Sequence, residues 1–239
     1  RDRPAAEIAR LLLVSVPTVQ ARNTRAKASL ADAAVAFETP DPAQWNERLG
    51  SVLGVISLLF TEGCATTTGE RWVRPDLADE ALRLGRVLAA LLPNEGEVHG
   101  LVALMELQRS RFAARERSTG EAVLLADQDR TRWDHSQIAR GIAALQRADA
   151  AAAARGIGRG SYALQAGIAR EHSIAVSVET TDWIEIVRLY SALEAIAPGP
   201  VVILNRAIAV SMADGPAAAL ILVDELAATG ALRGSPMIP

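Results

Sequence analysis

Residues 75–93 read PDLADEALRLGRVLAALLP, and this stretch decides the fold class. Its leucines recur on one face of a helix that we expect over residues 76–92. Pro75 stands just before that helix and Pro93 just after it, where proline is tolerated or ends a helix. Residues 95–112 carry a second helical pattern, opposed to the first. The two segments therefore predict a pair of helices that pack against each other.

The composition of the whole chain extends this prediction. The protein has 239 residues, which is enough for one large domain or two smaller ones. Alanine accounts for 46 residues, close to one in five, whereas aromatic residues make up only 4%. Alanine, leucine, arginine and glutamate favour helices, while strands favour β-branched and aromatic residues. We therefore exclude a β-rich protein and expect an all-α fold of stacked helices.

Cysteine usage and hydropathy exclude several classes of protein. The one cysteine, Cys64, leaves no disulfide framework and no multi-cysteine zinc site. The longest apolar run, residues 52–60, is interrupted by Gly54 and Ser57 and is shorter than the roughly 18 residues that a membrane helix needs. The sequence shows no signal peptide. We therefore expect a cytoplasmic protein with no membrane partner.

Charge is divided unevenly along the chain. The net charge is −3, but residues 1–30 carry +4 and residues 31–239 carry −7. Arginine supplies 24 of the 25 basic side chains, and Lys27 is the one lysine. A basic end on an acidic body predicts an anionic partner at the N-terminal end alone.

The basic N-terminal end has the pattern of a helical hairpin. Residues 5–13 predict a short helix, and a second helix starts near Val16 with Ser15 as its N-cap and Pro17 in its first turn. The inward stripe of the second helix is expected at Val16, Val19, Asn23, Ala26 and Leu30. Two short helices, a tight turn and a basic outer face are what a helix-turn-helix requires to enter the DNA major groove. An ordinary hairpin with a solvated basic face fits the same pattern.

Further helices and breaks follow along the chain. We expect helices over residues 43–63, 76–92, 95–112 and 136–155, and turns or loops over residues 39–42, 65–73, 118–120 and 127–134. Residues 156–160 read GIGRG. This segment follows a helix rather than a strand and lacks the Gly-Lys-Ser/Thr ending of a phosphate-binding loop, so we expect a flexible joint there.

The last third of the chain contains an internal repeat, with matches at offsets of 40 and 33 residues. The matching positions are residues 164–169 with 204–209, and Leu189 and Leu193 with Leu222 and Leu226. The difference between the offsets fits a longer loop, expected over residues 173–181, inside the first unit. A pair of helices repeating at about 34 residues is typical of tetratricopeptide (TPR) arrays.

Several segments resemble bacterial sigma factors of the extracytoplasmic-function (ECF) type. Residues 7–9, Ser15 and residues 18–26 (TVQARNTRA) are similar to region four, the part of these proteins that reads the −35 promoter element. More specific similarity is to the ECF group whose long C-terminal extension ends in a TPR-like array. These matches lie at residues 58–64, 74–84, 101–105, 125–134, 162–169, 181–183 and 205–217. The resemblance covers nearly the whole chain.

The resemblance implies an all-α protein in three parts. The expected bounds are residues 1–35 for a partial helix-turn-helix of region four, 36–45 for a linker, 46–155 for a helical middle domain and 161–239 for truncated TPR-like repeats. The chain starts at Arg1 without a methionine and ends at residues 235–239, which cannot finish a helix. We therefore expect a fragment of a longer protein, without the region two that opens the −10 element in this family.

The implied function is promoter recognition and transcription initiation as an alternative sigma factor, with RNA polymerase core and promoter DNA as partners. By the same resemblance, base edges would be faced by Thr18, Gln20, Ala21 and Arg22, and phosphates by Arg25 and Lys27. The chain departs from the family at Asn23, where an apolar residue is usual, and at Cys64, where tyrosine is usual. Ala28 and Ser29 replace a usual basic pair, which should weaken phosphate binding.

The acidic segment over residues 127–134 is a second candidate site. Asp127 and Asp129 begin like an EF-hand calcium loop. However, Arg132 stands at the glycine position and Ile138 at the position of the bidentate acid, so we expect no metal and a salt-bridged loop instead. In the family this segment is a signature, which suggests an interdomain or polymerase contact. The candidate contact residues are Glu62, Asp127, Asp129, Arg130, Trp133 and Asp134.

No catalytic constellation can be proposed from the sequence. His99, His135 and His172 lie far apart along the chain, and we expect Cys64 to be an inert core residue. We therefore expect neither an enzyme nor a cofactor. The alternative to a sigma factor is a TPR-like protein-interaction module without DNA binding of its own. In either case the array could bind a regulatory protein, and its acidic helices could clamp the basic N-terminal end.

Overall fold

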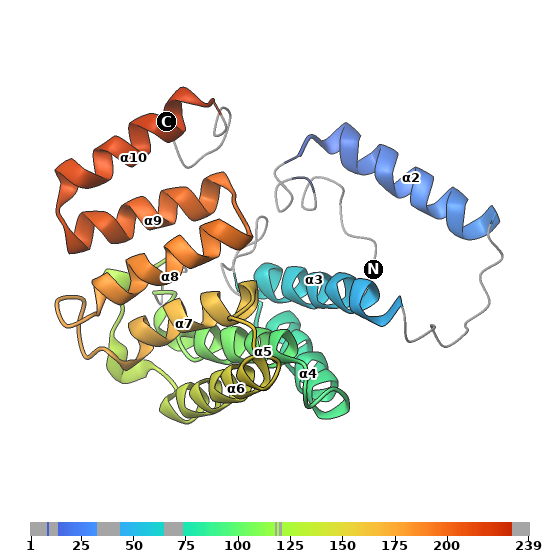
Figure 1. Ribbon diagram of the computed structural model, residues 1–239, viewed down its shortest axis with the longest axis horizontal. Coiled ribbons are helices and arrows are strands. Elements are labelled where there is room, and N and C mark those ends of the chain that lie inside the picture. The colour runs from blue at the N-terminus through green and yellow to red at the C-terminus, as the bar shows by residue number, and fades with distance from the viewer. Residues whose placement is uncertain are drawn as a thin grey trace.

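The fold is built from helices in the part of the chain that the computed structural model describes, namely Ala9 and residues 14–32, 44–64, 74–117, 119 and 121–230 (Figure 1). The helices are α2 (Val16–Asp32), α3 (Trp45–Cys64), α4 (Pro75–Leu91), α5 (Gly96–Arg109), α6 (His135–Ala154), α7 (Ser161–Ile174), α8 (Trp183–Ile196), α9 (Pro200–Ala213) and α10 (Pro216–Ala228). Short 3₁₀ turns η2 (Phe112–Ala114), η3 (Leu125–Asp127) and η4 (Arg130–Arg132) separate α5 from α6. The described residues form no strand beyond one isolated bridge, so the all-α prediction is confirmed.

Several helices begin at proline or directly after a capping residue that the sequence shows. α4 begins at Pro75, and the N-terminus of α2 is capped as predicted, because the backbone N–H of Thr18 donates to Ser15 Oγ at 3.3 Å. α6 begins after Asp134, whose carboxylate accepts the backbone N–H of Gln137 at 2.9 Å. α5 ends earlier than expected, and η2 takes up the remainder. The predicted helix over residues 5–13 lies outside the described residues, except for Ala9. So do the predicted breaks over residues 39–42, 65–73 and 118–120, except for Thr119.

α2 lies apart from the other labelled helices (Figure 1). Val19 is buried, at 2% exposure, but the rest of the predicted inward stripe is wrong, since Val16, Asn23 and Ala26 are exposed. A stripe with an amide in its middle and an alanine near its end offers little apolar area to bury against a partner. The side chain of Leu30 lies outside the described residues.

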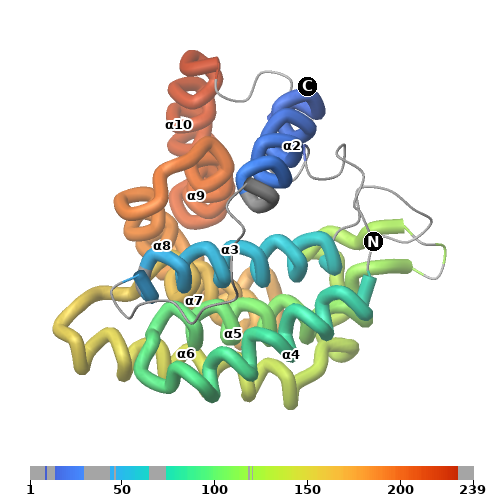
Figure 2. The backbone as a smooth tube through the Cα atoms, turned by 90° about the vertical axis from the view of Figure 1, so that its right-hand side faces the viewer, coloured from blue at the N-terminus to red at the C-terminus, as the bar shows by residue number. Residues whose placement is uncertain are grey.

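α5 is the centre of the fold. Every residue from Val98 to Leu107 is buried, which requires neighbours on all sides of the helix. α4, α6 and α7 pack against it, and α3 also reaches it. Figure 2 shows α3 to α7 gathered together, with α8, α9 and α10 extending away from them. One hydrophobic core runs through this group, from Leu53 of α3 to Ala169 of α7.

Glycine allows the central helices to approach one another closely. The contacts are Gly63 with Ala78, Gly100 with Ala163, and Gly141 with Leu107. A Cβ atom at Gly100 would lie 2.6 Å from the backbone nitrogen of Ala163, a distance that a real Cβ does not reach. The crossing of α5 and α7 therefore depends on the absence of a side chain at this position.

The start of α7, directly after the glycine-rich segment over residues 156–160, is held to α5. Glu97 Oε2 accepts the backbone N–H of Tyr162 at 3.0 Å, and Glu97 Oε1 accepts that of Ala163 at 3.2 Å. The carboxylate thus caps the N-terminus of α7, which has no capping side chain of its own. Gly160 makes room for it, since a Cβ atom there would lie 2.3 Å from Glu97 Cδ. The end of the predicted flexible joint that adjoins α7 is thus in contact with α5, whereas a Cβ atom at Gly156 or Gly158 would meet nothing within 4 Å.

The C-terminal helices stack in chain order, α7 on α8, α8 on α9 and α9 on α10 (Figure 1). The predicted repeat units correspond to α7–α8 and α9–α10. A second apolar core forms between these helices, and it includes Leu189 and Leu193 of α8. Leu226, which the repeat matches to Leu193, is likewise buried in α10. A loop over residues 175–182 separates α7 from α8, whereas residues 214–215 suffice between α9 and α10, as the two offsets predict.

Replacing Gly100 by alanine tests the crossing of α5 and α7. Gly100→Ala should lower the free energy of unfolding by about 1–3 kcal/mol, because the new methyl group has no space against Ala163. Gly54→Ala in α3 is the matched control, since a Cβ atom there meets nothing within 4 Å. That substitution should stabilise the helix by up to about 1 kcal/mol. Urea unfolding of both variants measures the difference, and a shift of the same sign in both would contradict the packing argument.

Candidate functional site

The predicted DNA-reading residues lie along α2. The exposed ones are Gln20, Ala21, Arg22, Arg25 and Lys27. Thr18 is half-buried, and its hydroxyl lies 2.8 Å from the hydroxyl of Ser15, within hydrogen-bond distance. Arg25 Nε donates to the carbonyl of Ala21 at 3.4 Å, which holds the guanidinium along the helix. α2 thus offers its basic side chains to solvent.

The positive charge on α2 is not neutralised within the described part of the chain. Arg22, Arg25 and Lys27 form none of the ion pairs found among these residues. The hypothesised clamp, in which acidic helices cover this end, stays a hypothesis.

Two acids of the 127–134 segment, Asp129 and Asp134, serve as caps. Asp129 Oδ1 accepts the backbone N–H of Thr131 at 3.0 Å and the hydroxyl of the same residue at 2.6 Å. Asp134 caps α6, and Asp127 is exposed. Within the described structure no ion pair joins these acids to the arginines between them, so the predicted salt-bridged loop is wrong. Short acidic side chains bond preferentially to nearby backbone donors, which is what they do here.

Arg130 and Trp133 connect this segment to the rest of the fold. Arg130 Nη1 donates to the backbone carbonyls of His172 and Ala175, at 2.6 and 2.9 Å, near the end of α7. The Arg130 guanidinium also lies 4.7 Å from the centre of the Trp133 ring. Trp133 belongs to the main core, and Glu62, from the same set of predicted contact residues, is buried near the end of α3.

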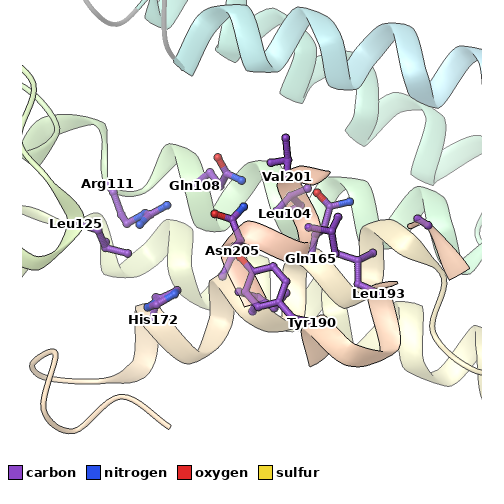
Figure 3. A pocket seen from close by; sticks show the side chains of 14 residues that line it. Leu104, Gln108, Arg111, Leu125, Gln165, His172, Tyr190, Leu193, Val201 and Asn205 are labelled. Atoms are coloured by element: carbon purple, nitrogen blue, oxygen red, sulfur yellow. The ribbon is translucent and has the colours of Figure 1, made fainter. Parts of the chain in front are cut away.

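A cavity of about 380 Å³ lies between α5, α7, α8 and α9 (Figure 3). Its polar lining residues are Gln108, Arg111, Gln165, His172, Tyr190 and Asn205. Figure 3 shows these side chains reaching into one space from α5, the turn after it, α7, α8 and α9. Leu104, Leu193 and Val201 are among the apolar residues of the wall. Convergent polar groups in a largely apolar hollow of this size are typical of small-molecule sites.

Arg111 is the charged residue of the cavity wall. Its Nε is buried and has no hydrogen-bond partner, and its guanidinium lies 6.0 Å from the centre of the Trp133 ring. Burial, together with the nearby Arg115 and Arg130 guanidinium groups, lowers the pKa of Arg111 to about 10. The group is therefore still a cation at neutral pH, and none of the residues found to line the cavity is an acid.

His172 lies in the same wall as an uncharged ring. Burial lowers its pKa to about 4, and the positive charges of Arg111 and Arg130 act in the same direction. The ring packs edge-on against Trp183, with centroids 5.3 Å apart. At neutral pH His172 offers the cavity a neutral donor or acceptor, and Arg111 is the charged side chain among the described lining residues.

Cys64 behaves as the sequence predicts. Its side chain is buried, and burial raises the pKa of the thiol to about 11 despite the nearby Arg115. The thiolate that nucleophilic chemistry requires is therefore scarce at neutral pH.

The residues of the cavity were not recognisable as a group in the sequence. Arg111 is separated from Asn205 by more than ninety positions, and neither belongs to a motif with a known chemical role. One signal was present, because the match of residues 164–169 with 204–209 pairs Gln165 with Asn205. Equivalent positions of α7 and α9 thus bring an amide to the cavity from each repeat unit.

A second hollow, of about 500 Å³, lies between α3 and α4. Its wall is apolar except for Ser51, and Val55 and Leu91 on its rim are 66% and 70% exposed. This groove lacks the polar groups that chemistry on a ligand would need.

Neither a metal-binding cluster nor a membrane-spanning helix is found among the described residues. No three side chains of His, Cys, Asp or Glu come together there in a way that could hold a metal ion. No helix in this part of the chain has both the length and the apolar character needed to cross a bilayer.

The pH dependence of stability tests the environment of His172. The folded state keeps this ring neutral down to about pH 4, whereas the unfolded chain takes up the proton near the ordinary pKa of 6.5. Acidification from neutral pH to about 4 therefore favours unfolding, by on the order of 3 kcal/mol from this residue. In the His172→Gln variant, the free energy of unfolding should therefore fall less steeply between neutral pH and pH 4. Urea unfolding at a series of pH values measures this slope for both proteins. Equal slopes in the two proteins would contradict the assigned environment.

Comparison with known proteins gives relatives without a stated activity. Residues 48–149, which are less than half of the chain, match the model of a "Family of unknown function (DUF6596)". An uncharacterized protein of Rhizobium meliloti (strain 1021) is 47% identical over 220 residues, covering 92% of this chain and 51% of the relative. The chain thus spans about half the length of the curated relative that it matches. No solved structure matches the chain, and the resemblance to ECF sigma factors stays a prediction.

Proposed function

We propose that the chain belongs to an alternative sigma factor of the ECF type, in which α2 reads the −35 promoter element. The observation that carries this proposal is the position of α2, a capped helix that stands apart from the helical stack with its basic side chains exposed.

The geometry of α2 suits a recognition helix. Its 17 residues span about 25 Å, which is enough to cross the major groove. Thr18, Gln20, Ala21 and Arg22 lie in its first half, the part that contacts base edges in helix-turn-helix proteins. Arg25 and Lys27 follow on the same helix and would contact phosphates, which fix the register of the protein on DNA.

The helices from α3 to α10 would form the C-terminal extension of such a factor. We assign this part a protein-interaction or regulatory role, with RNA polymerase core and a regulatory protein as candidate partners. The support is architectural. A stack of helix pairs presents extended surfaces for binding rather than a catalytic constellation.

DNA binding by the purified chain tests the proposal. The chain should enrich a sequence from a random duplex pool, and its affinity for that duplex should fall steeply with salt in an anisotropy titration. Arg22→Ala should weaken binding to the selected sequence by about ten-fold or more and relax the preference, as loss of a base contact does. Arg25→Ala and Lys27→Ala should each reduce the salt slope by about one.

Arg147→Ala is the matched control, because Arg147 is an exposed arginine of α6 that lies outside the proposed interface. It should leave both affinity and slope unchanged. If the chain enriches no sequence, or if the Arg22 and Arg147 variants behave alike, the proposal fails. The protein-interaction module without DNA binding would then account for the fold.

A further inference from the structure

The cavity between α5, α7, α8 and α9 carries a positive charge that no acid among its described lining residues offsets. Arg111 is a cation whose Nε is buried without a hydrogen-bond partner. Among the described neighbours, Arg115 and Arg130 add further positive charge, and His172 is neutral. A cation that is partly withdrawn from water and has no counter-ion costs free energy, and an anion in the cavity would offset that cost.

The other polar groups of the cavity are also available to a ligand. Gln108, Asn205 and Tyr190 make no side-chain hydrogen bond within the described part of the chain, whereas Gln165 donates to the carbonyl of Ser161 at 3.2 Å. They lie across the same space as Arg111 (Figure 3). Amide and phenol groups of this kind would orient the uncharged part of a ligand.

Size and wall chemistry narrow the class of anion. The volume of about 380 Å³ is within the range of small-molecule pockets. Leu104, Leu193 and Val201 give the wall apolar stretches that an inorganic ion would leave without a partner. The planar fork of a guanidinium matches the two oxygens of a carboxylate.

From these observations we infer that this cavity binds a small organic carboxylate, whose carboxyl group pairs with Arg111 and whose body lies between α7, α8 and α9. The site would act whether or not α2 reads DNA. Because its walls come from the central helix α5 and from the repeat helix α9, the bound molecule would join the two apolar cores of the fold.

A binding screen on the whole chain tests this site. The probes are monocarboxylates from acetate through hexanoate and benzoate to 2-naphthoate, each paired with its primary amide. The readouts are the thermal midpoint and the side-chain amide resonances of Gln108, Gln165 and Asn205. At least one organic acid should raise the midpoint and shift these resonances, and it should bind about ten-fold or more tightly than its amide.

Variants locate the binding within the cavity. Arg111→Gln should abolish the response to the acid, and Asn205→Leu, on the opposite wall, should weaken it while leaving Arg111 in place. Arg147→Ala on the outer surface should bind as the unchanged chain does. Circular dichroism of each variant shows that it folds, and either of the two cavity variants is sufficient to judge the site.

Any one of four outcomes would overturn the inference. One is that no acid of the series binds. Another is that acids and amides bind alike, or that Arg111→Gln retains the binding. The last is that inorganic phosphate binds as tightly as the best organic acid, which would show an anion site with no part for an organic body.

Discussion

The contact between Gly100 of α5 and Ala163 of α7 is the constraint on which the rest of the structure depends. Two helix backbones meet there so closely that a single methyl group would not fit. The contact places α7 against a helix that is buried on every side, and α8, α9 and α10 follow from α7 in chain order. The many alanines allow the same kind of close packing, since small side chains let several helices approach one another.

Polar interactions then fix the helices that these small residues bring together. Glu106 is a buried carboxylate of α5, paired with Arg86 of α4 at 2.5 Å and with Arg140 of α6 at 3.5 Å. Glu106 joins three helices, and loss of its arginine partners would leave a buried carboxylate without a counter-ion. Arg111, in the turn that follows this helix, has no such acid among the described residues. That contrast is what distinguishes the cavity from the structural ion pairs around it.

Much of the helical framework could be predicted from the sequence, because its signals are local. Prolines mark the start of α4, α9 and α10, and Ser15 marks that of α2. The exposure of Asn23 could not be predicted from spacing, since a helical period does not say whether a neighbouring helix exists. Arg130 was expected to pair with acids beside it and instead bonds to carbonyls more than forty residues away. The cavity was missed because its walls meet only after folding.

The Glu97 carboxylate has a consequence for how such a protein can be divided. Residues 156–160 look like a place to cut, since they are rich in glycine and separate two helical regions. A cut there would remove the cap of α7, which belongs to α5, and would expose the apolar surface that α5 and α7 share. The repeats therefore cannot be moved to another protein as an independent module from this point. Shortening or lengthening of the array is tolerated best at its other end, where each helix contacts mainly its neighbour.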